Sequence, residues 1–111
     1  MNEEKDNDKV SGFNNVRELI SYSSGGVFSK VLDKNSTGDV TLFCMAAGTD
    51  MSEHTASRDG FIYVVEGDGI FNLEGTDIPM KEGVMFSMKK DAKHSLKANA
   101  DTTFILFLRD A

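Results

Sequence analysis

The sequence is poor in the residues that build covalent cross-links and imidazole-rich sites. Its 111 residues include one cysteine, one proline, two histidines and no tryptophan. A single cysteine cannot form an internal disulfide, which excludes a disulfide scaffold and a zinc site built on cysteine pairs. The two histidines, His54 and His94, limit any imidazole metal site within one chain to two nitrogen ligands.

Basic charge and long apolar runs are also scarce. The chain has 12 basic and 18 acidic residues, for a formal net charge of −6, and its densest basic patch, residues 89–93, is interrupted by Asp91. This balance excludes a typical nucleic-acid-binding protein. The longest apolar runs, 42–47 and 104–108, are far shorter than the roughly 20 residues of a membrane-spanning helix, and no targeting sequence opens the chain. We therefore expect a cytoplasmic protein without nucleic-acid or membrane partners, and an unpaired Cys44 agrees with a reducing compartment.

The chain divides into a short polar opening segment and one domain. Residues 1–9 have no apolar residue after Met1 and predict a disordered acidic tail. Residues 10–111 have the size of a single domain. Asn15 can cap a short helix over residues 16–20, whose apolar positions have helical spacing.

From residue 27 onward the pattern is that of β-structure. Turn signals recur about every 8–12 residues or fewer, which favours an all-β sandwich or barrel over a parallel α/β sheet. A turn is predicted at 66–69 and a hairpin at Gly75. Strands are expected at 27–32, 39–45, 53–57, 61–66, 70–74, 76–80, 84–88, 94–98 and 103–108.

Two of the expected strands are apolar on both faces. Residues 61–65 and 104–108 each run without a polar interruption. A strand of a small barrel with two apolar faces needs cover on its outer side as well. A homodimer is the preferred interpretation, and a two-sheet monomer with apolar outer strands is the alternative.

Other side chains have two interpretations each. Five methionines are expected mainly as core packing, with a methionine-lined pocket for an apolar ligand as the alternative; they are Met45, Met51, Met80, Met85 and Met88. Arg58 is expected to pair with Asp59 at the surface, or with an anionic ligand at the barrel mouth. Cys44, in an apolar strand, is expected as a buried, inert thiol.

Two segments follow a recognisable pair of spacings. The first spacing, G-x5-H-x-H-x(3,4)-E-x6-G, is matched by Gly48, His54 and Gly67. Ala56 stands at its second histidine position and Gly60 at its glutamate position.

The second spacing, G-x5-P-x-G-x2-H-x3-N, is matched by Gly83 and His94. Its proline, glycine and asparagine are replaced by Lys89, Asp91 and Ala98. The two segments together resemble the paired motifs of the cupin superfamily, and of its small single-domain members in particular. The resemblance implies an all-β fold, a double-stranded β-helix or jelly-roll barrel with a short N-terminal helix, which is often dimeric.

The resemblance also implies where a metal would bind. In metal-binding cupins, two histidines and a glutamate of the first motif and a histidine of the second hold one divalent ion. In this sequence that set is reduced to His54 and His94, which would need water, an anion or another side chain to hold a transition metal. Asp59 would supply a carboxylate if the segment before Gly60 bulges. The cofactor prediction stays open between none and one divalent ion of Fe, Mn, Ni, Zn or Cu.

We interpret the two histidines as the markers of a ligand pocket. The predicted pocket residues are His54, Ala56, Gly60, Ile62 and His94, with alternation directing Ile62 inward. The preferred function is binding of a small molecule, with no activity defined. The alternatives are a metal-dependent enzyme of isomerase, decarboxylase or dioxygenase type acting on a small polar substrate, and a structural dimer with a vestigial pocket.

Overall fold

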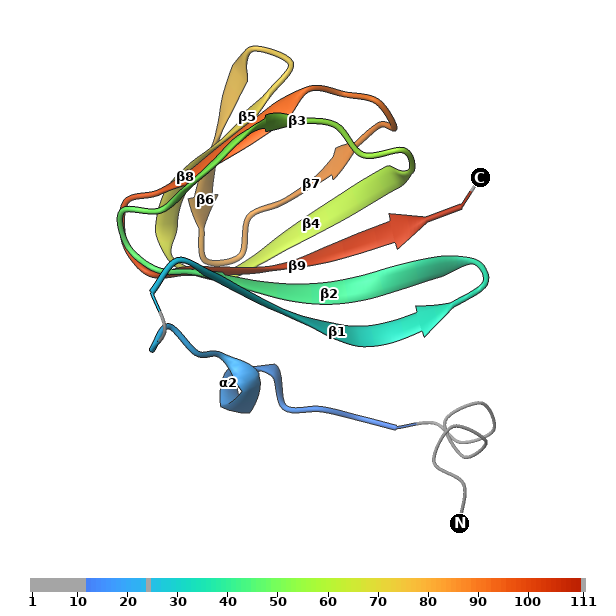
Figure 1. The fold of residues 1–111 in the computed structure, drawn as a ribbon, viewed down its shortest axis with the longest axis horizontal. Helices are drawn as coiled ribbons and strands as arrows, with labels where there is room; N and C mark the ends of the chain where they lie inside the picture. The colour runs from blue at the N-terminus through green and yellow to red at the C-terminus, as the bar shows by residue number, and fades with distance from the viewer. Residues whose placement is uncertain (1–11, 24, 111) are drawn as a thin grey trace.

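A computed structural model describes residues 12–23 and 25–110 (Figure 1). Within this part of the chain, two antiparallel sheets have the strand orders β1-β2-β9-β4-β7 and β3-β8-β5-β6. The elements are α2 (Val16–Leu19), β1 (Val27–Asn35), β2 (Gly38–Met45), β3 (Asp50–His54), β4 (Asp59–Glu66), β5 (Asp68–Leu73), β6 (Thr76–Lys81), β7 (Met85–Met88), β8 (His94–Ala98) and β9 (Thr102–Arg109). The tail predicted at residues 1–9 lies outside the described residues.

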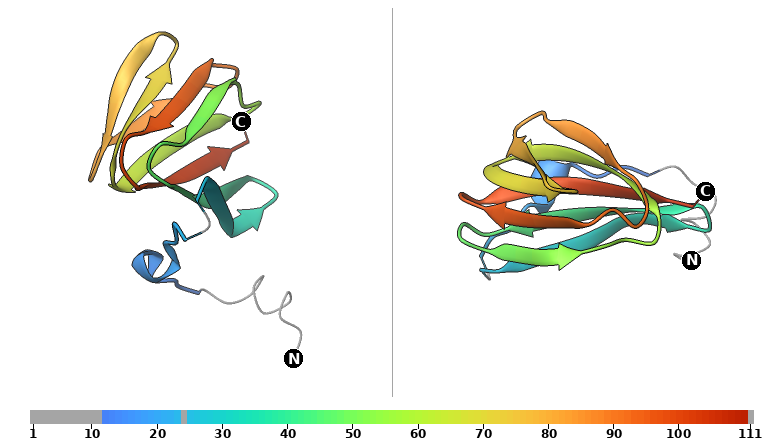
Figure 2. Two further views of the ribbon diagram at one scale, coloured as in Figure 1. Left: turned by 60° about the vertical axis from the view of Figure 1, so that its left-hand side comes forward. Right: turned by 90° about the horizontal axis from the view of Figure 1, so that it is seen from above.

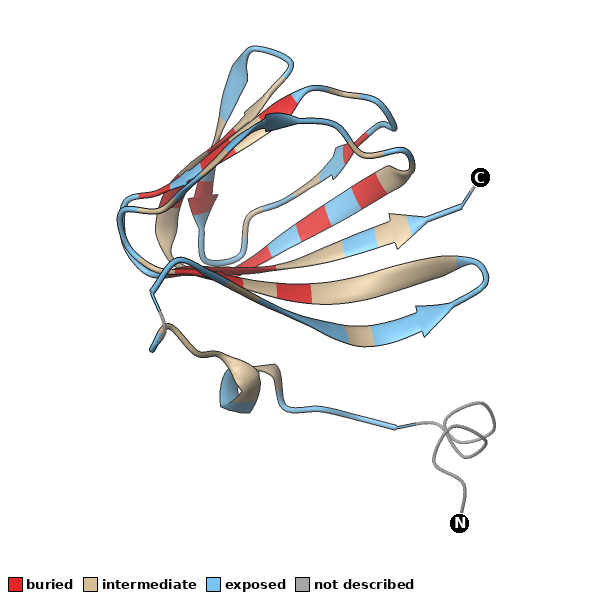
Figure 3. Ribbon diagram, viewed as in Figure 1, coloured by how far each residue is buried: buried red, intermediate tan, exposed pale blue. Residues whose placement is uncertain are grey.

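The two sheets lie face to face, as the turned views show (Figure 2). Alternation along β4 explains which residues enter the space between them: Ile62 and Val64 are fully buried, whereas Phe61 and Tyr63 are exposed (Figure 3). The inward direction predicted for Ile62 is therefore confirmed. The buried apolar cluster is made of Met45, Ile62, Val64, Phe71, Met80, Met88, Leu96, Ala98 and Phe104. This all-β, two-sheet architecture with a short helix confirms the predicted fold class.

The passage from one sheet to the other takes a single residue. The turn predicted at 66–69 is wrong, because β4 ends at Glu66 and β5 begins at Asp68. Gly67 has a φ of 134°, and a Cβ placed there would lie 2.5 Å from the Oγ1 of Thr102. Only glycine combines this backbone angle with so close an approach.

The strand predicted at 53–57 lies earlier in the chain, at Asp50–His54. Pairing with β8 already starts in the preceding turn: the Gly48 amide donates to the Ala98 carbonyl at 2.8 Å, and the Ala98 amide donates to the Thr49 carbonyl at 2.9 Å. The register of β3 against β8 is therefore already set in this turn. The apolar pattern of the sequence alone did not reveal it.

The helical segment is tied to the five-stranded sheet through Glu66. Arg17 forms an ion pair with this carboxylate at 2.9 Å, and the Tyr22 hydroxyl donates to it at 2.9 Å and also contacts the hydroxyl of Thr103. Burial above all raises the pKa of the Tyr22 phenol; the Thr103 hydroxyl opposes the rise, and the bond to Glu66 adds to it. Tyr22 therefore stays protonated, and it can donate to Glu66.

The outer face of the five-stranded sheet is partly uncovered. Phe61 on β4 pairs with Phe107 on β9, and both are 38% exposed. Tyr63 pairs with both Ile105 and Met85, and Met85 is 56% exposed. We call these five side chains the outer apolar patch. Among the described residues, no helix has the length and apolar character needed to cross a membrane.

Replacing Gly67 with alanine is predicted to destabilise the fold strongly. The new methyl group would collide with Thr102 and the backbone would be held at a positive φ, so the free energy of unfolding should fall by about 3 kcal/mol. Gly83→Ala is the matched control: its φ is 88° but nothing lies within 4 Å of the added atom. It should lose only about 1 kcal/mol in urea denaturation. Equal losses in the two variants would contradict the close approach at Thr102.

Removal of the Tyr22 hydroxyl is predicted to loosen the N-terminal segment. Tyr22→Phe leaves the buried Thr103 hydroxyl and the Glu66 carboxylate without this partner, so the free energy of unfolding should fall by about 1–2 kcal/mol. Tyr63→Phe, which removes a hydroxyl from an exposed residue of the outer face, should change it by less than about 0.5 kcal/mol. Urea denaturation of both variants checks the difference, and equal stabilities would contradict it.

Candidate functional site

His54 and His94 are direct partners on neighbouring strands of the four-stranded sheet. Their Cα atoms are paired between β3 and β8, and their ring centroids lie 4.1 Å apart at an interplanar angle of 64°. The two imidazoles that the sequence places forty residues apart are thus in contact.

A β-bulge in β3 brings a second side chain to the same face. Met51 pairs with Leu96, and the next pair along the strands is His54 with His94. Between these pairs β3 advances three residues while β8 advances two, and this extra residue is a bulge. On a regular strand Met51 and His54 would face opposite sides, but the bulge lets both face the interior.

Each imidazole is oriented by a carbonyl group of its own chain segment. Nδ1 of His54 lies 2.6 Å from the Ser52 carbonyl oxygen, and Nδ1 of His94 lies 3.0 Å from the Ala92 carbonyl oxygen. A carbonyl oxygen can only accept, so both Nδ1 atoms carry the proton. An imidazole with its single proton on Nδ1 keeps a lone pair on Nε2 for a ligand.

The environments of the two rings differ. His94 is only 5% exposed and stacks on Phe71 at 5.4 Å with a 7° angle between the rings, whereas His54 is exposed. Burial lowers the pKa of His94; the bond to Ala92 opposes the change, and a charged His54 would lower it further. His94 is consequently neutral at pH 7, and the pair extends from the interior to the surface.

The two histidines line a small apolar cavity between the sheets. Its volume is about 60 Å³, and its lining residues are Phe43, Met51, His54, Ile62, Phe71, Met88, His94, Leu96, Phe104 and Leu106. This lining contains no carboxylate, lysine or arginine. The only side-chain nitrogen atoms that it presents are those of the two imidazoles.

Three of the five predicted pocket residues, His54, Ile62 and His94, line this cavity. Ala56 lies beyond the end of β3, where its carbonyl accepts from the Asp91 amide at 2.8 Å, so it does not share a strand face with His54. Gly60 is buried on β4 but is not part of the lining. Neither residue lines the cavity, although Gly60 lies next to Met88, which does.

Asp59, whose carboxylate was expected to complete a metal site, forms a hydrogen bond with the backbone instead. Oδ1 of Asp59 accepts from the Lys90 amide at 2.9 Å. Within residues 12–23 and 25–110, no three His, Cys, Asp or Glu side chains gather closely enough to hold a metal. The expected Arg58–Asp59 pair is also wrong, because Arg58 binds Asp39 at 2.6 Å and Asp110 at 3.5 Å. The side chains available at the histidines do not fit the three-histidine, one-glutamate set of a divalent ion.

Sequence reasoning missed the role of two methionines. Met51 and Met88 line the cavity together with the histidines, although they come from strands distant in sequence. Met88 is the cross-strand partner of Gly60, and a Cβ placed at Gly60 would lie 3.0 Å from the Cε of Met88. The space next to the glycine is therefore occupied by a thioether side chain. The sequence analysis expected both residues mainly as core packing, with a methionine-lined pocket as the alternative, and it did not link them to the histidines.

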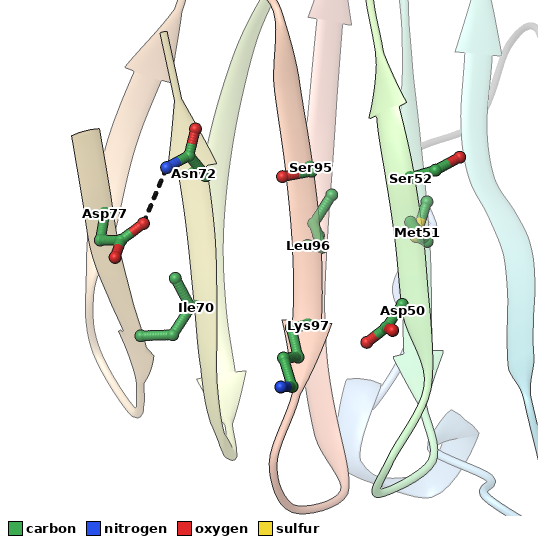
Figure 4. Close-up of a pocket in the computed structure, with 9 residues that line it drawn as sticks. All are labelled: Asp50, Met51, Ser52, Ile70, Asn72, Asp77, Ser95, Leu96 and Lys97. Carbon is green, nitrogen blue, oxygen red and sulfur yellow. Dashed lines mark hydrogen bonds between the residues drawn. The ribbon is translucent and has the colours of Figure 1, made fainter. Parts of the chain in front are cut away.

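A larger hollow of about 460 Å³ lies on the outer face of the four-stranded sheet (Figure 4). In this hollow the Asn72 amide donates to Asp77 at 2.8 Å. It is open and separate from the histidines, and its lining is Asp50, Met51, Ser52, Ile70, Asn72, Asp77, Ser95, Leu96 and Lys97. The alternation of polar residues along β3, β5 and β8 was a signal for such a face, which the sequence analysis did not use.

The two antiparallel sheets and the two motif spacings are those of jelly-roll barrel proteins. The cupin domain family matches residues 41–108, which are more than half of the chain. The protein therefore belongs to the cupin family. No curated protein matches its sequence.

Solved structures with the same fold share little sequence with this chain. A conserved protein of unknown function from Streptococcus pyogenes superposes with a TM-score of 0.80 at 14% identity, covering 93% of this chain and 90% of that one. An RmlC-like cupin from Desulfovibrio desulfuricans has a TM-score of 0.80 at 18% identity, covering 90% and 97%. KdgF from Halomonas sp. has a TM-score of 0.69 at 21% identity, covering 78% and 81%. These similarities show the fold alone.

Proposed function

We propose that the protein binds a small neutral ligand at the Nε2 atoms of His54 and His94. The observation that carries this proposal is an apolar cavity whose lining presents side-chain nitrogen atoms only from two imidazoles, each bound to a backbone carbonyl through Nδ1. His94 is buried, and a buried polar group needs a hydrogen-bond partner, which a ligand at its Nε2 would provide. We propose no catalysed reaction.

The chemistry of the lining restricts the ligand. Both Nδ1–H groups donate hydrogen bonds to backbone carbonyls, so Nε2 of each ring can only accept. The ligand should therefore carry an O–H or N–H donor. An anion would enter a cavity with no cationic side chain, at a high desolvation cost. The cavity volume of about 60 Å³ corresponds to roughly two water molecules in liquid water, so only the donor end of a larger ligand would enter.

The alternative of a metal-dependent enzyme lacks support from the donor set. A divalent ion of the family type would need a carboxylate or a third imidazole, and neither lies in the cavity lining. Salicylate 1,2-dioxygenase from Pseudoaminobacter salicylatoxidans has the same fold, with a TM-score of 0.71 at 20% identity, but this chain covers only 26% of it. At that identity the likeness does not transfer its activity.

We also propose that a second copy of the chain covers the outer apolar patch. The patch is uncharged, so two chains with a net charge of −6 can meet there without bringing acidic side chains together. A basic partner would instead be expected at an acidic surface. The paired rows of Phe61 with Phe107 and of Tyr63 with Ile105 would form the centre of a symmetric contact.

Phenol is predicted to bind at the histidine pair. Titration of phenol, followed through the side-chain ¹⁵N signals of the histidines, should shift the Nε2 signals saturably because the phenolic O–H donates to them. Benzoate, of similar size but negatively charged, should not shift them. His54→Phe should weaken binding by about fivefold or more, through loss of one acceptor of a neutral hydrogen bond.

Asn72→Ala is the matched control for this titration, because it alters the outer hollow and leaves the inner cavity intact. It should bind phenol like the unaltered protein. A linear, unsaturable shift would contradict the proposal, and loss of binding in Asn72→Ala would place the ligand on the outer face instead.

The dimer is predicted to depend on the outer apolar patch. Sedimentation equilibrium at micromolar concentration should give twice the chain mass. Phe61→Asp should weaken the dimer by about tenfold or more, because an unpaired carboxylate would be buried in an apolar contact. Val31→Asp introduces the same charge at an exposed apolar position of β1 and should leave the dimer intact. A single monomeric species in the unaltered protein would contradict this proposal.

A further inference from the structure

We propose that a hollow on the outer face of the five-stranded sheet binds a small aromatic carboxylate, with the carboxylate on the Arg109 guanidinium and the ring against Phe61 and Phe107. The hollow has a volume of about 200 Å³, and its lining residues are Gly60, Phe61, Ser87, Phe107 and Arg109. It shares no lining residue with the cavity of the histidine pair. This inference therefore goes beyond the small-molecule site proposed there.

Strand pairing brings the lining together from three neighbouring strands. Phe61 on β4 is the cross-strand partner of Phe107 on β9 and of Ser87 on β7, so the three side chains form one row across the sheet. Arg109 lies two residues beyond Phe107 on β9, and alternation places both on the same face. The outer face therefore presents a guanidinium next to a row that contains two aromatic rings.

The two phenyl rings provide a surface for a flat apolar group. They meet edge to face, with centroids 6.1 Å apart and an interplanar angle of 60°, and both side chains are 38% exposed. Aromatic rings attract further rings in offset or edge-to-face contacts, which stabilise a complex beyond the apolar area that they bury. An aromatic ligand is thus favoured over an aliphatic ligand of the same charge.

Arg109 is the charged group that this hollow offers to a ligand. Its side chain is exposed, and within residues 12–23 and 25–110 it takes part in no ion pair. Asp59, its cross-strand partner, instead accepts from the Lys90 amide at 2.9 Å. Asp110, the next residue along the chain, pairs with Arg58 at 3.5 Å. A guanidinium without a counter-ion can take a carboxylate through two parallel hydrogen bonds.

The combination of a cation with two rings specifies the class of ligand. A neutral aromatic molecule would leave the guanidinium without a partner, and an inorganic anion would leave the rings uncovered. A carboxylate carried on an aromatic ring uses both features, and its charge stays at an exposed side chain, where burial does not penalise it. The volume of about 200 Å³ equals that of roughly six or seven water molecules in the liquid, which is enough for one ring with its carboxylate.

The same rings belong to the outer apolar patch, which a second copy of the chain is proposed to cover. An aromatic carboxylate and a second copy would compete for Phe61 and Phe107, so the ligand should shift the dimer towards the monomer. Tyr63 lies in the patch but does not line the hollow. Tyr63→Ser should weaken the dimer, because a large ring leaves the centre of the contact, and it keeps the hollow intact. This variant allows binding to be measured on the monomer.

The test is a titration of benzoate into the full chain, followed by calorimetry and through the side-chain Nε–H signal of Arg109. The unaltered protein, or Tyr63→Ser where the unaltered protein sediments as a dimer, should bind one benzoate per chain saturably and shift this signal. Arg109→Gln should weaken binding about tenfold or more, through loss of the charge-assisted pair. Phe107→Leu keeps an apolar side chain without the ring and should weaken binding about threefold or more.

Matched controls separate the two parts of the ligand and the two outer hollows. Lys97→Gln removes the same charge from the hollow on the four-stranded sheet and should leave benzoate affinity unchanged. Cyclohexanecarboxylate has the same charge without an aromatic face and should bind more weakly than benzoate. Benzyl alcohol keeps the ring without the charge and should bind about tenfold more weakly or less. Urea denaturation of each variant confirms that it is folded.

The outcomes decide this site separately from the histidine pair. Absence of saturable binding, or equal affinities in Arg109→Gln and Lys97→Gln, would overturn the site. Loss of binding in Lys97→Gln would overturn it by moving the anion to the other hollow. A dimer that stays intact at saturating benzoate would also overturn it, because the ligand ring would not then lie on Phe61 and Phe107. A shift of the histidine signals by benzoate would instead contradict the neutral ligand proposed for the inner cavity.

Discussion

The bulge between Met51 and His54 determines what the inner cavity contains. Along a regular strand these two side chains would face opposite sides of the sheet, and only one of them would face the interior. The extra residue on β3 turns His54 inward opposite His94 while Met51 stays inward opposite Leu96. The contact between the imidazoles and the mixed nitrogen and sulfur lining therefore both depend on one local irregularity of the sheet.

The site is organised before any ligand arrives. Each imidazole is held by a carbonyl two residues earlier in the chain, and the inner ring is also stacked on Phe71. A ligand at Nε2 would therefore not have to fix the tautomers or the ring orientation, and this lowers the cost of binding. Burial of the His94 ring disfavours its charged form, and its lowered pKa reflects this.

Strand alternation made most of the fold predictable, including the inward direction of Ile62. It failed where a backbone angle or a distant partner decides the structure. Gly67 alone links β4 to β5 at a positive φ, and Arg58 pairs with Asp39 across the fold instead of with the neighbouring Asp59. The histidine positions came from motif spacing, but Met88 could not be found that way, because only the pairing of β4 with β7 brings it to the cavity.

The pairing of a glycine on β4 with a methionine on β7 keeps this part of the barrel packed. Gly60 and Met88 are cross-strand partners, and the large side chain of the pair belongs to β7. Interiors tolerate changes of side chain when the total volume is kept. A glutamate restored at position 60 alone would begin 3.0 Å from the Met88 methyl group, so its side chain and the thioether compete for one space. Recovery of a carboxylate ligand would therefore require a second change at Met88. Gly60 and Met88 therefore act as one unit, in which the methyl end of Met88 fills the space beside the glycine.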